Sequence, residues 1–150
     1  MAHDSGREEL RPHLRVEPSL PLSTILVRGG PDNAALIRSH ARRTHRLYCL
    51  DGVALFGISA FGAIDQTGPA SRDGLLLGRL SSYEWVHLPT TEALQSAGFP
   101  VLASFRRPHF TIGLADDSSE EVARLLAALG PAEENPYNGA VRLRRTERPQ

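Results

Sequence analysis

The chain of 150 residues has the length of one compact domain. It carries 17 basic and 17 acidic side chains, and every basic one is arginine. The absence of lysine excludes a lysine-dependent phosphate loop, a Schiff-base lysine and a lysine general base, although codon bias alone would also produce it. The single cysteine, Cys49, excludes an internal disulfide and a zinc cluster built from cysteines.

The two ends of the chain differ in composition from the rest. Residues 1–22 place prolines between scattered charges and predict an extended N-terminal arm, whereas residues 142–150 predict a basic C-terminal tail. A single packed domain is therefore expected over residues 23–141. No apolar run approaches the roughly 20 residues of a membrane-spanning helix, and the polar start lacks the apolar stretch of a secretory signal. These features predict a cytoplasmic protein without membrane association.

The predicted domain begins with a strand and a helix. The apolar run at residues 24–28 predicts a strand buried on both faces, and the Gly-Gly-Pro of residues 29–31 ends it. Asp32 or Asn33 is placed to cap a helix that runs to about Leu47.

The middle of the chain predicts shorter elements. After a turn at residues 51–52, residues 54–61 form a second buried strand, and residues 63–74 are mostly loop. A short helix is expected at residues 75–80 and a strand at residues 85–88.

The last third of the chain predicts a helix, a hairpin and a second helix. Thr90 or Thr91 caps the first helix, and residues 101–105 and 109–114 form the hairpin. The final helix starts with a capping box from Ser118 to Glu121 and carries an apolar stripe at Val122, Leu125, Leu126 and Leu129. The predicted fold is a single α+β domain, with a central mixed sheet of about five strands and three to four helices.

Charge is distributed unevenly along the chain. Residues 23–50 carry five arginines against one acid, and residues 116–141 carry one arginine against six acids. One interpretation is that Arg38 and Arg42 on the first helix help to bind an anion such as a nucleotide or RNA. The alternative is a solvated helix face, or pairing with the acidic last helix. No helix-turn-helix or metal-finger spacing is present, so sequence-specific DNA binding is not expected.

Two residues in the first half of the domain are candidates for a ligand site. Arg28 leaves a buried strand directly before two glycines and a helix start, where an arginine fork and backbone N–H groups suit a phosphate. The alternative is a tight turn in which Arg28 forms a salt bridge. Ser59 lies within an apolar strand and would line the floor of a pocket, or else fill space and bond to the backbone.

The runs around these two residues resemble the ADP-ribosyltransferases, which include small bacterial toxins. That fold is built around an arginine on an early strand, a serine-bearing strand next and a later glutamate. Residues 27–29 match the first position, and residues 57–61 match the second loosely, without its usual second hydroxyl. Glu84 and Glu92 are the only candidates for the third, and Glu92 suits a helix start. The resemblance implies NAD as the cofactor.

A histidine in the predicted hairpin is the candidate for proton transfer. His109 and Thr111 point to the same face of a strand, where an imidazole can move protons and a hydroxyl can hold a phosphate oxygen. The run resembles one His-x-Thr motif of the two-histidine phosphoesterases, but residues 87–90 place the second threonine one position too far. Arg106 and Arg107 make this hairpin end electropositive. The alternative is a turn with surface arginines and a half-buried histidine.

These candidates lead to one hypothesis and one alternative. The hypothesis is a small domain that binds a phosphate-bearing ligand, with toxin-like transferase or phosphodiester chemistry; whether it is an enzyme stays open. Arg28 would anchor the anion, His109 would transfer a proton, and Ser59 or Thr111 would orient the ligand. No metal site is expected. A toxin-like role implies a neutralising protein partner. The alternative is a non-catalytic interaction module, such as an immunity, antitoxin or regulatory partner.

Overall fold

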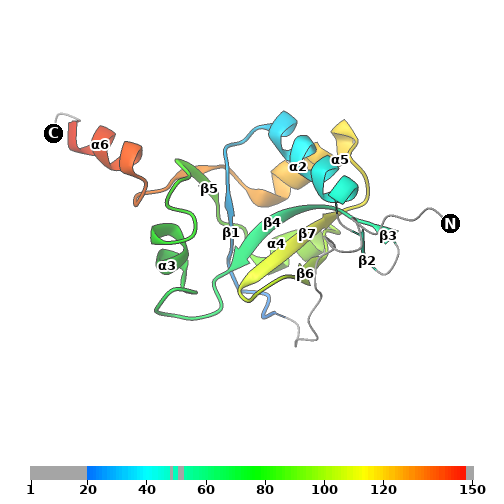
Figure 1. Cartoon of the computed structure of the whole chain (residues 1–150), viewed down its shortest axis with the longest axis horizontal. Coiled ribbons are helices and arrows are strands. Elements are labelled where there is room, and N and C mark those ends of the chain that lie inside the picture. The colour runs from blue at the N-terminus through cyan, green and yellow to red at the C-terminus, as the bar shows by residue number, and fades with distance from the viewer. Residues whose placement is uncertain (1–19, 48, 51–52, 148–150) are drawn as a thin grey trace.

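The computed structural model describes residues 20–47, 49–50 and 53–147. Within these residues, five helices and a six-stranded antiparallel sheet form a single α+β domain (Figure 1). The fold class is therefore confirmed, with a slightly higher strand count than expected. The sheet contains β1 (Leu26–Gly29), β4 (Phe56–Gly62), β5 (Trp85–His87), β6 (Val101–Ala103), β7 (His109–Leu114) and β8 (Glu133–Glu134), in the order β6-β7-β4-β1-β5-β8.

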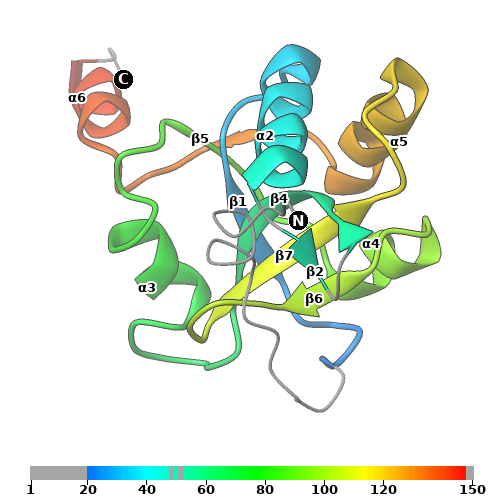
Figure 2. The ribbon, with the colours of Figure 1, turned by 45° about the vertical axis from the view of Figure 1, so that its right-hand side comes forward.

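The remaining elements surround this sheet. A separate antiparallel pair joins β2 (Cys49–Leu50) to β3 (Val53–Ala54). Figure 2 shows two of the helices, α2 and α5, on the same side of the sheet. The helices are α2 (Ala34–Leu47), α3 (Arg72–Leu77), α4 (Thr91–Ser96), α5 (Ser119–Leu129) and α6 (Gly139–Glu147).

All pairings in the six-stranded sheet are antiparallel, where a mixed sheet was expected. The apolar run of β1 has the predicted cause, which is burial on both faces. Leu26 packs into a core cluster that α2, α4 and α5 cover, and Val27 packs into a second cluster that α3 covers. A strand buried on both faces needs apolar residues on both, whatever the direction of its neighbours.

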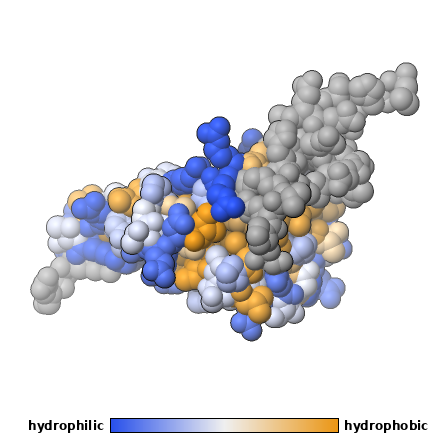
Figure 3. Space-filling view, turned by 90° about the horizontal axis from the view of Figure 1, so that it is seen from below, coloured by the Kyte–Doolittle hydropathy of each residue, from blue (hydrophilic) through white to orange (hydrophobic). Residues whose placement is uncertain are grey.

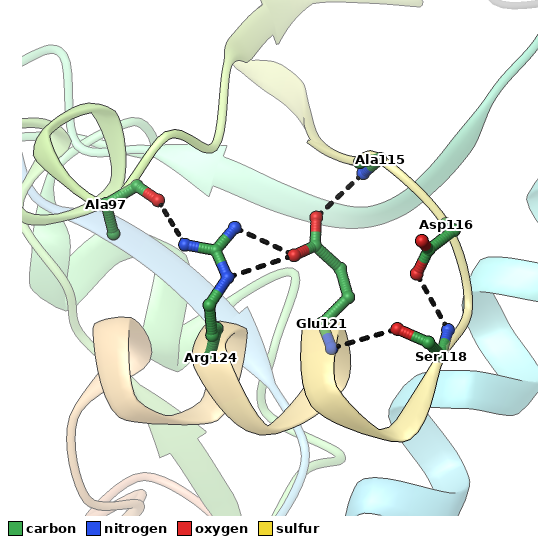
Figure 4. A network of polar contacts seen from close by, with 6 residues as sticks. All are labelled: Ala97, Ala115, Asp116, Ser118, Glu121 and Arg124. Atoms are coloured by element: carbon green, nitrogen blue, oxygen red, sulfur yellow. Dashed lines mark hydrogen bonds and ion pairs between the residues drawn. The ribbon is translucent and has the colours of Figure 1, made fainter.

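The start of α5 confirms half of the predicted capping box. The Ser118 hydroxyl accepts a hydrogen bond from the backbone N–H of Glu121 at 3.1 Å. The reciprocal bond is absent, because the backbone N–H of Ser118 donates to Asp116 instead. The Glu121 carboxylate accepts from the backbone N–H of Ala115 and from Arg124, as Figure 4 shows. The carboxylate therefore joins the helix to the end of β7.

The expected C-terminal tail is largely helical. Residues 142–147 belong to α6, which lies at one end of the molecule (Figure 1). Arg144 forms ion pairs with Glu84 and Glu134 at 3.2 and 3.0 Å, which ties the helix to the segments before β5 and at β8. The predicted N-terminal arm lies almost wholly outside the described residues, and Leu20, the first of them, packs against the core.

The surface shows where apolar side chains are left uncovered. Seen from below in Figure 3, hydrophobic residues gather in the middle of the molecule, next to hydrophilic residues. The large apolar side chains that stay exposed include Leu77, Trp85 and Leu143. None of the described helices has the length and apolar character that a membrane crossing requires.

Candidate ligand pocket

A change of partner along β1 creates the candidate site. Leu26 and Val27 pair with β4, but Arg28 and Gly29 pair with β5. The strand therefore separates from β4 after Val27, and a pocket of about 250 Å³ opens there. Its lining comes from β1, α2, β4 and the segment between α3 and β5: Arg28, Gly29, His40, Arg43, Thr44, Ile58, Ser59, Phe61, Leu80 and Tyr83.

The lining is positively charged. Among the described residues it contains Arg28, Arg43 and His40 but no aspartate or glutamate. A further cation lies nearby, because the guanidinium of Arg79 lies 5.2 Å from the centre of the Phe61 ring. Partial burial, together with the positive charges of Arg28 and Arg43, lowers the pKa of His40, which favours its neutral form. The pocket is thus suited to an anion.

Arg28 is almost completely buried, with 2% of its surface exposed. Its Nη1 donates to the carbonyl of Pro31 at 3.2 Å and to Nδ1 of His87 at 3.4 Å. Its Nη2 has no hydrogen-bond partner among the described residues. Burial lowers the pKa of Arg28 because the cation has lost its water, while Tyr83 and Asp32 act in the opposite direction. Among the described residues, Pro31 and His87 hold this arginine, and the salt bridge expected as the alternative is not found.

His87 connects the buried cation to a carboxylate at the surface. Its side chain is fully buried, and Nε2 lies 2.7 Å from Oδ1 of Asp32. Because a guanidinium can only donate, Nδ1 of His87 must accept and Nε2 must carry the proton. Burial lowers the pKa of His87 more than the bond to Asp32 raises it, so the ring is neutral. The other Asp32 oxygen accepts from the backbone N–H of Ala132.

The two glycines after Arg28 are required by close packing. A Cβ atom at Gly29 would lie 2.6 Å from the ring of Tyr83, and one at Gly30 would lie 2.6 Å from Nη1 of Arg28. Gly30 also has a φ of +136°, which side chains rarely allow. The expected role of these glycines was a close backbone approach to a ligand. In the structure they admit an aromatic ring and the guanidinium itself.

The structure brings together only part of the predicted catalytic set. Ser59 is exposed and lines the pocket with Arg28. His109 does not line it, although its ring contacts the ring of Phe61, with centroids 5.3 Å apart. Thr111 is buried on β7, and Ser104 connects the two: its hydroxyl lies 3.0 Å from Nδ1 of His109 and 2.7 Å from the Thr111 hydroxyl. His109 and Thr111 therefore lie on one face of β7, as predicted, but neither lines the pocket.

The arginines proposed to widen the positive field lie elsewhere. Arg38 donates to the Asp117 carbonyl at 3.0 Å and also bonds Ser119. Arg42 forms an ion pair with the Asp117 carboxylate at 2.5 Å. These contacts correspond to the alternative interpretation, in which the basic helix pairs with the acidic one. Neither side chain lines the pocket.

The arginines of the hairpin are also separate from the pocket. Arg106 and Arg107 are exposed in the turn between β6 and β7, before a cis bond to Pro108, and neither is part of the lining. Within the described part of the chain, no group of three or more His, Cys, Asp or Glu side chains is placed to hold a metal.

Several residues of the site were missed from the sequence. Arg43 and His40 were not assigned to it, because periodicity alone does not tell which side of a helix meets a pocket. Asp32 was considered only as one of two possible helix caps, and the other, Asn33, provides that cap. His87 was considered only as part of an imperfect second His-x-Thr motif. No family model, curated protein or solved structure matches the chain, so the site rests on its own geometry.

Proposed function

We propose that this domain binds a phosphate-bearing ligand of the nucleotide class in the pocket between β1 and β4. The observation that carries the proposal is the shared position of Arg28 and Ser59 in one cationic pocket. They come from two strands, and the part of the lining that the structure describes contains no carboxylate to neutralise the arginines.

The buried arginine supports an anionic ligand. An N–H group that is buried without a partner costs about 1–3 kcal/mol, and Nη2 of Arg28 is such a group among the described residues. An anion that accepts from this nitrogen would offset that cost. Arg43, for which no ion pair is found within the described residues, supplies a second cation at the pocket. A guanidinium fork suits phosphate better than a point charge does.

The other side chains suit the remainder of a nucleotide. The Ser59 hydroxyl can hydrogen-bond a phosphate or ribose oxygen, and the rings of Tyr83 and Phe61 offer apolar surface. Small-molecule sites commonly enclose about 300–1,000 Å³. A pocket of about 250 Å³ therefore encloses part of such a ligand, and the rest extends over the mouth.

Transfer chemistry with NAD is the reaction to test first, because the residues that resemble ADP-ribosyltransferases are Arg28 and Ser59. No counterpart of their later glutamate is in the lining: Glu84 pairs with Arg144, and Glu92 lies in the first turn of α4. For proton transfer, His40 is now a better candidate than His109, because it lines the pocket. Incubation with labelled NAD tests this part, and no transfer to protein or nucleic acid would oppose it.

Binding is tested with neighbouring arginines of one helix. We expect calorimetry at low salt to detect ADP-ribose binding and Arg43→Ala to weaken it about tenfold, the effect of one lost charge-assisted hydrogen bond. Arg42→Ala is the matched control and should leave the affinity within about twofold, because Arg42 pairs with Asp117 outside the pocket. Equal losses for both variants, or no binding to the wild type, would overturn the proposal.

In the cell, we propose that the domain acts as a toxin in the cytoplasm and that a protein partner neutralises it. Expression of the chain alone should then inhibit growth, and Arg28→Ala should relieve the inhibition if the pocket is responsible. Inhibition that survives both Arg28→Ala and Arg43→Ala would remove the pocket from the explanation. The interaction-module alternative predicts capture of a protein partner without any nucleotide binding.

A further inference from the structure

We infer that Asp32 and His87 form a positioning chain that holds the guanidinium of Arg28 for its ligand. The inference rests on the proposed function, since it names the residues that orient the central cation of the same pocket. None of the lining residues is Asp32 or His87, so the two act through Arg28 rather than on the ligand.

The geometry of the chain is directional. Asp32 accepts from Nε2 of His87 at 2.7 Å, and Nδ1 of His87 accepts from Nη1 of Arg28 at 3.4 Å. Each link fixes the next, because the imidazole can donate at one nitrogen and accept at the other only in its neutral form. The carboxylate thus selects the tautomer that the arginine requires.

The burial of the three groups argues for a specific role. His87 is completely buried, and Arg28 nearly so, whereas the Asp32 side chain is 50% exposed. A long flexible cation would not stay in one rotamer without fixed acceptors, and its order has an entropic cost. Here Nη1 is bound by the protein through His87 and Pro31, while Nη2 has no partner among the residues described. The chain therefore engages one nitrogen of the fork, and the other is buried without a partner among the described residues.

The three residues also connect separate parts of the fold. Arg28 is on β1, His87 is its register partner on β5, and Asp32 lies in the loop that leads to α2. The second oxygen of Asp32 binds the backbone N–H of Ala132, at 2.9 Å. The carboxylate is consequently fixed from both sides and cannot turn away from His87 without losing a second hydrogen bond.

The test compares a substitution that breaks the chain with one that preserves it. His87→Leu removes both hydrogen bonds at similar volume. In His87→Gln, the amide N–H can donate to Asp32 and the amide oxygen can accept from Arg28. We expect His87→Leu to weaken ADP-ribose binding about tenfold or more and His87→Gln to stay within about threefold of the wild type. Asp32→Ala breaks the chain from its exposed end and should weaken binding as His87→Leu does.

Nuclear magnetic resonance of the ¹⁵N-labelled full chain gives a reading that does not need a ligand. The side-chain N–H signals that Arg28→Lys removes identify Arg28. These signals should be sharp in the wild type and His87→Gln, and broadened by exchange in His87→Leu and Asp32→Ala. The ring of His87 should show a protonated Nε2 and an unprotonated Nδ1 at pH 7.

The outcomes separate the inference from the proposed function. A folded His87→Leu or Asp32→Ala variant that binds ADP-ribose as tightly as the wild type would overturn the positioning chain alone. Arg28 signals that are identical in all variants would overturn it as well, whether or not a ligand binds. If the wild type binds no ADP-ribose, the proposed function fails, and the Arg28 signals still decide whether the chain orders the guanidinium. If His87→Leu does not fold, the comparison is made between Asp32→Ala and His87→Gln.

Discussion

Two pairs of arginines in this domain have opposite surroundings. Arg38 and Arg42 face α5 on one side of α2, where Asp117 and Ser119 accept their hydrogen bonds. Arg43 lies about 100° further round the same helix than Arg42 and lines a pocket in which none of the described residues is a carboxylate.

Arg28 resembles Arg43 rather than Arg38 and Arg42, because among the described residues no aspartate or glutamate contacts its guanidinium directly. A basic stretch of sequence can therefore contain cations of two kinds. Those near α5 have their charge balanced or their hydrogen bonds accepted there, and those at the pocket have no carboxylate partner among the described residues.

Among the substitutions considered, Arg28→Met should change ligand binding the most. The substitution keeps the length of the side chain and removes its charge, so ADP-ribose binding should fall about a hundredfold, the loss of more than one charge-assisted hydrogen bond. The free energy of unfolding should change by less than about 2 kcal/mol, because removing a buried cation offsets the loss of the donor to His87 and Pro31. Calorimetry and urea unfolding measure the two quantities. A variant that loses stability by several kcal/mol would mean that Arg28 serves the fold instead.

Gly29→Ala should have the next largest effect, on stability. The added methyl would lie 2.6 Å from the Tyr83 ring, so we expect a loss of about 1–3 kcal/mol in the free energy of unfolding. The double variant with Tyr83→Ala should recover part of that loss, because the obstructing ring is gone. Gly139→Ala is the control and should stay within about 0.5 kcal/mol, since no atom lies within 4 Å of the added methyl.

The pH dependence of stability should depend on His87. Its pKa in the folded protein is below the ordinary value of 6.5, so in the window between the two values only the unfolded chain binds the proton. Stability is therefore full above pH 6.5 and declines as the pH falls below it. His87→Gln should make this decline shallower in urea unfolding at pH 7, 6 and 5. His40→Gln should do the same to a smaller degree, because His40 is exposed and its pKa is also lowered. A slope unchanged in His87→Gln would contradict the assignment.

The smallest effect is expected where the arginine already has a partner. Arg42 is 59% exposed, and pairs of this kind contribute about 0–1 kcal/mol to stability. Arg42→Ala should therefore lower the free energy of unfolding by less than about 1 kcal/mol, and the difference should shrink as salt is added. Urea unfolding at low and high salt checks this. A larger loss would indicate that the α2–α5 contact depends on charge rather than on apolar packing.

Local signals in the sequence predicted the elements better than the site. The strand at Leu26, the helix after Asn33 and the helix after Ser118 follow from apolar periodicity and capping residues, which act within a few positions of the chain. The α6 helix was missed, because its polar residues gave no apolar stripe. Its contacts with the rest of the domain are long-range ones, such as the buried Val141 and the ion pair of Arg144 with Glu134.

The site depends on contacts that no local pattern encodes. Arg28 and Ser59 were assigned to one site from their chemistry, but the strand arrangement behind it was not predicted: their common pocket arises because β1 leaves β4 for β5. Which strand pairs with which is set by the whole sheet. The choice between Arg42 and Arg43 likewise required the position of α5 beside α2. His109 was placed on the correct face beside Thr111, but the neighbouring ring of Phe61, not the imidazole, reaches the pocket.

The buried amide of Asn135 has a practical consequence for handling this protein. Its side-chain nitrogen donates to the carbonyls of Leu76 and Leu80, at 3.1 and 3.0 Å, and its backbone N–H donates to the backbone carbonyl of Glu84. The chain after α5 thus closes the end of α3, and a protein shortened to the end of α5 would leave those carbonyls bare and the second core cluster open to water. Affinity tags and fusion partners belong beyond the final helix, and trimming for crystallisation should stop there.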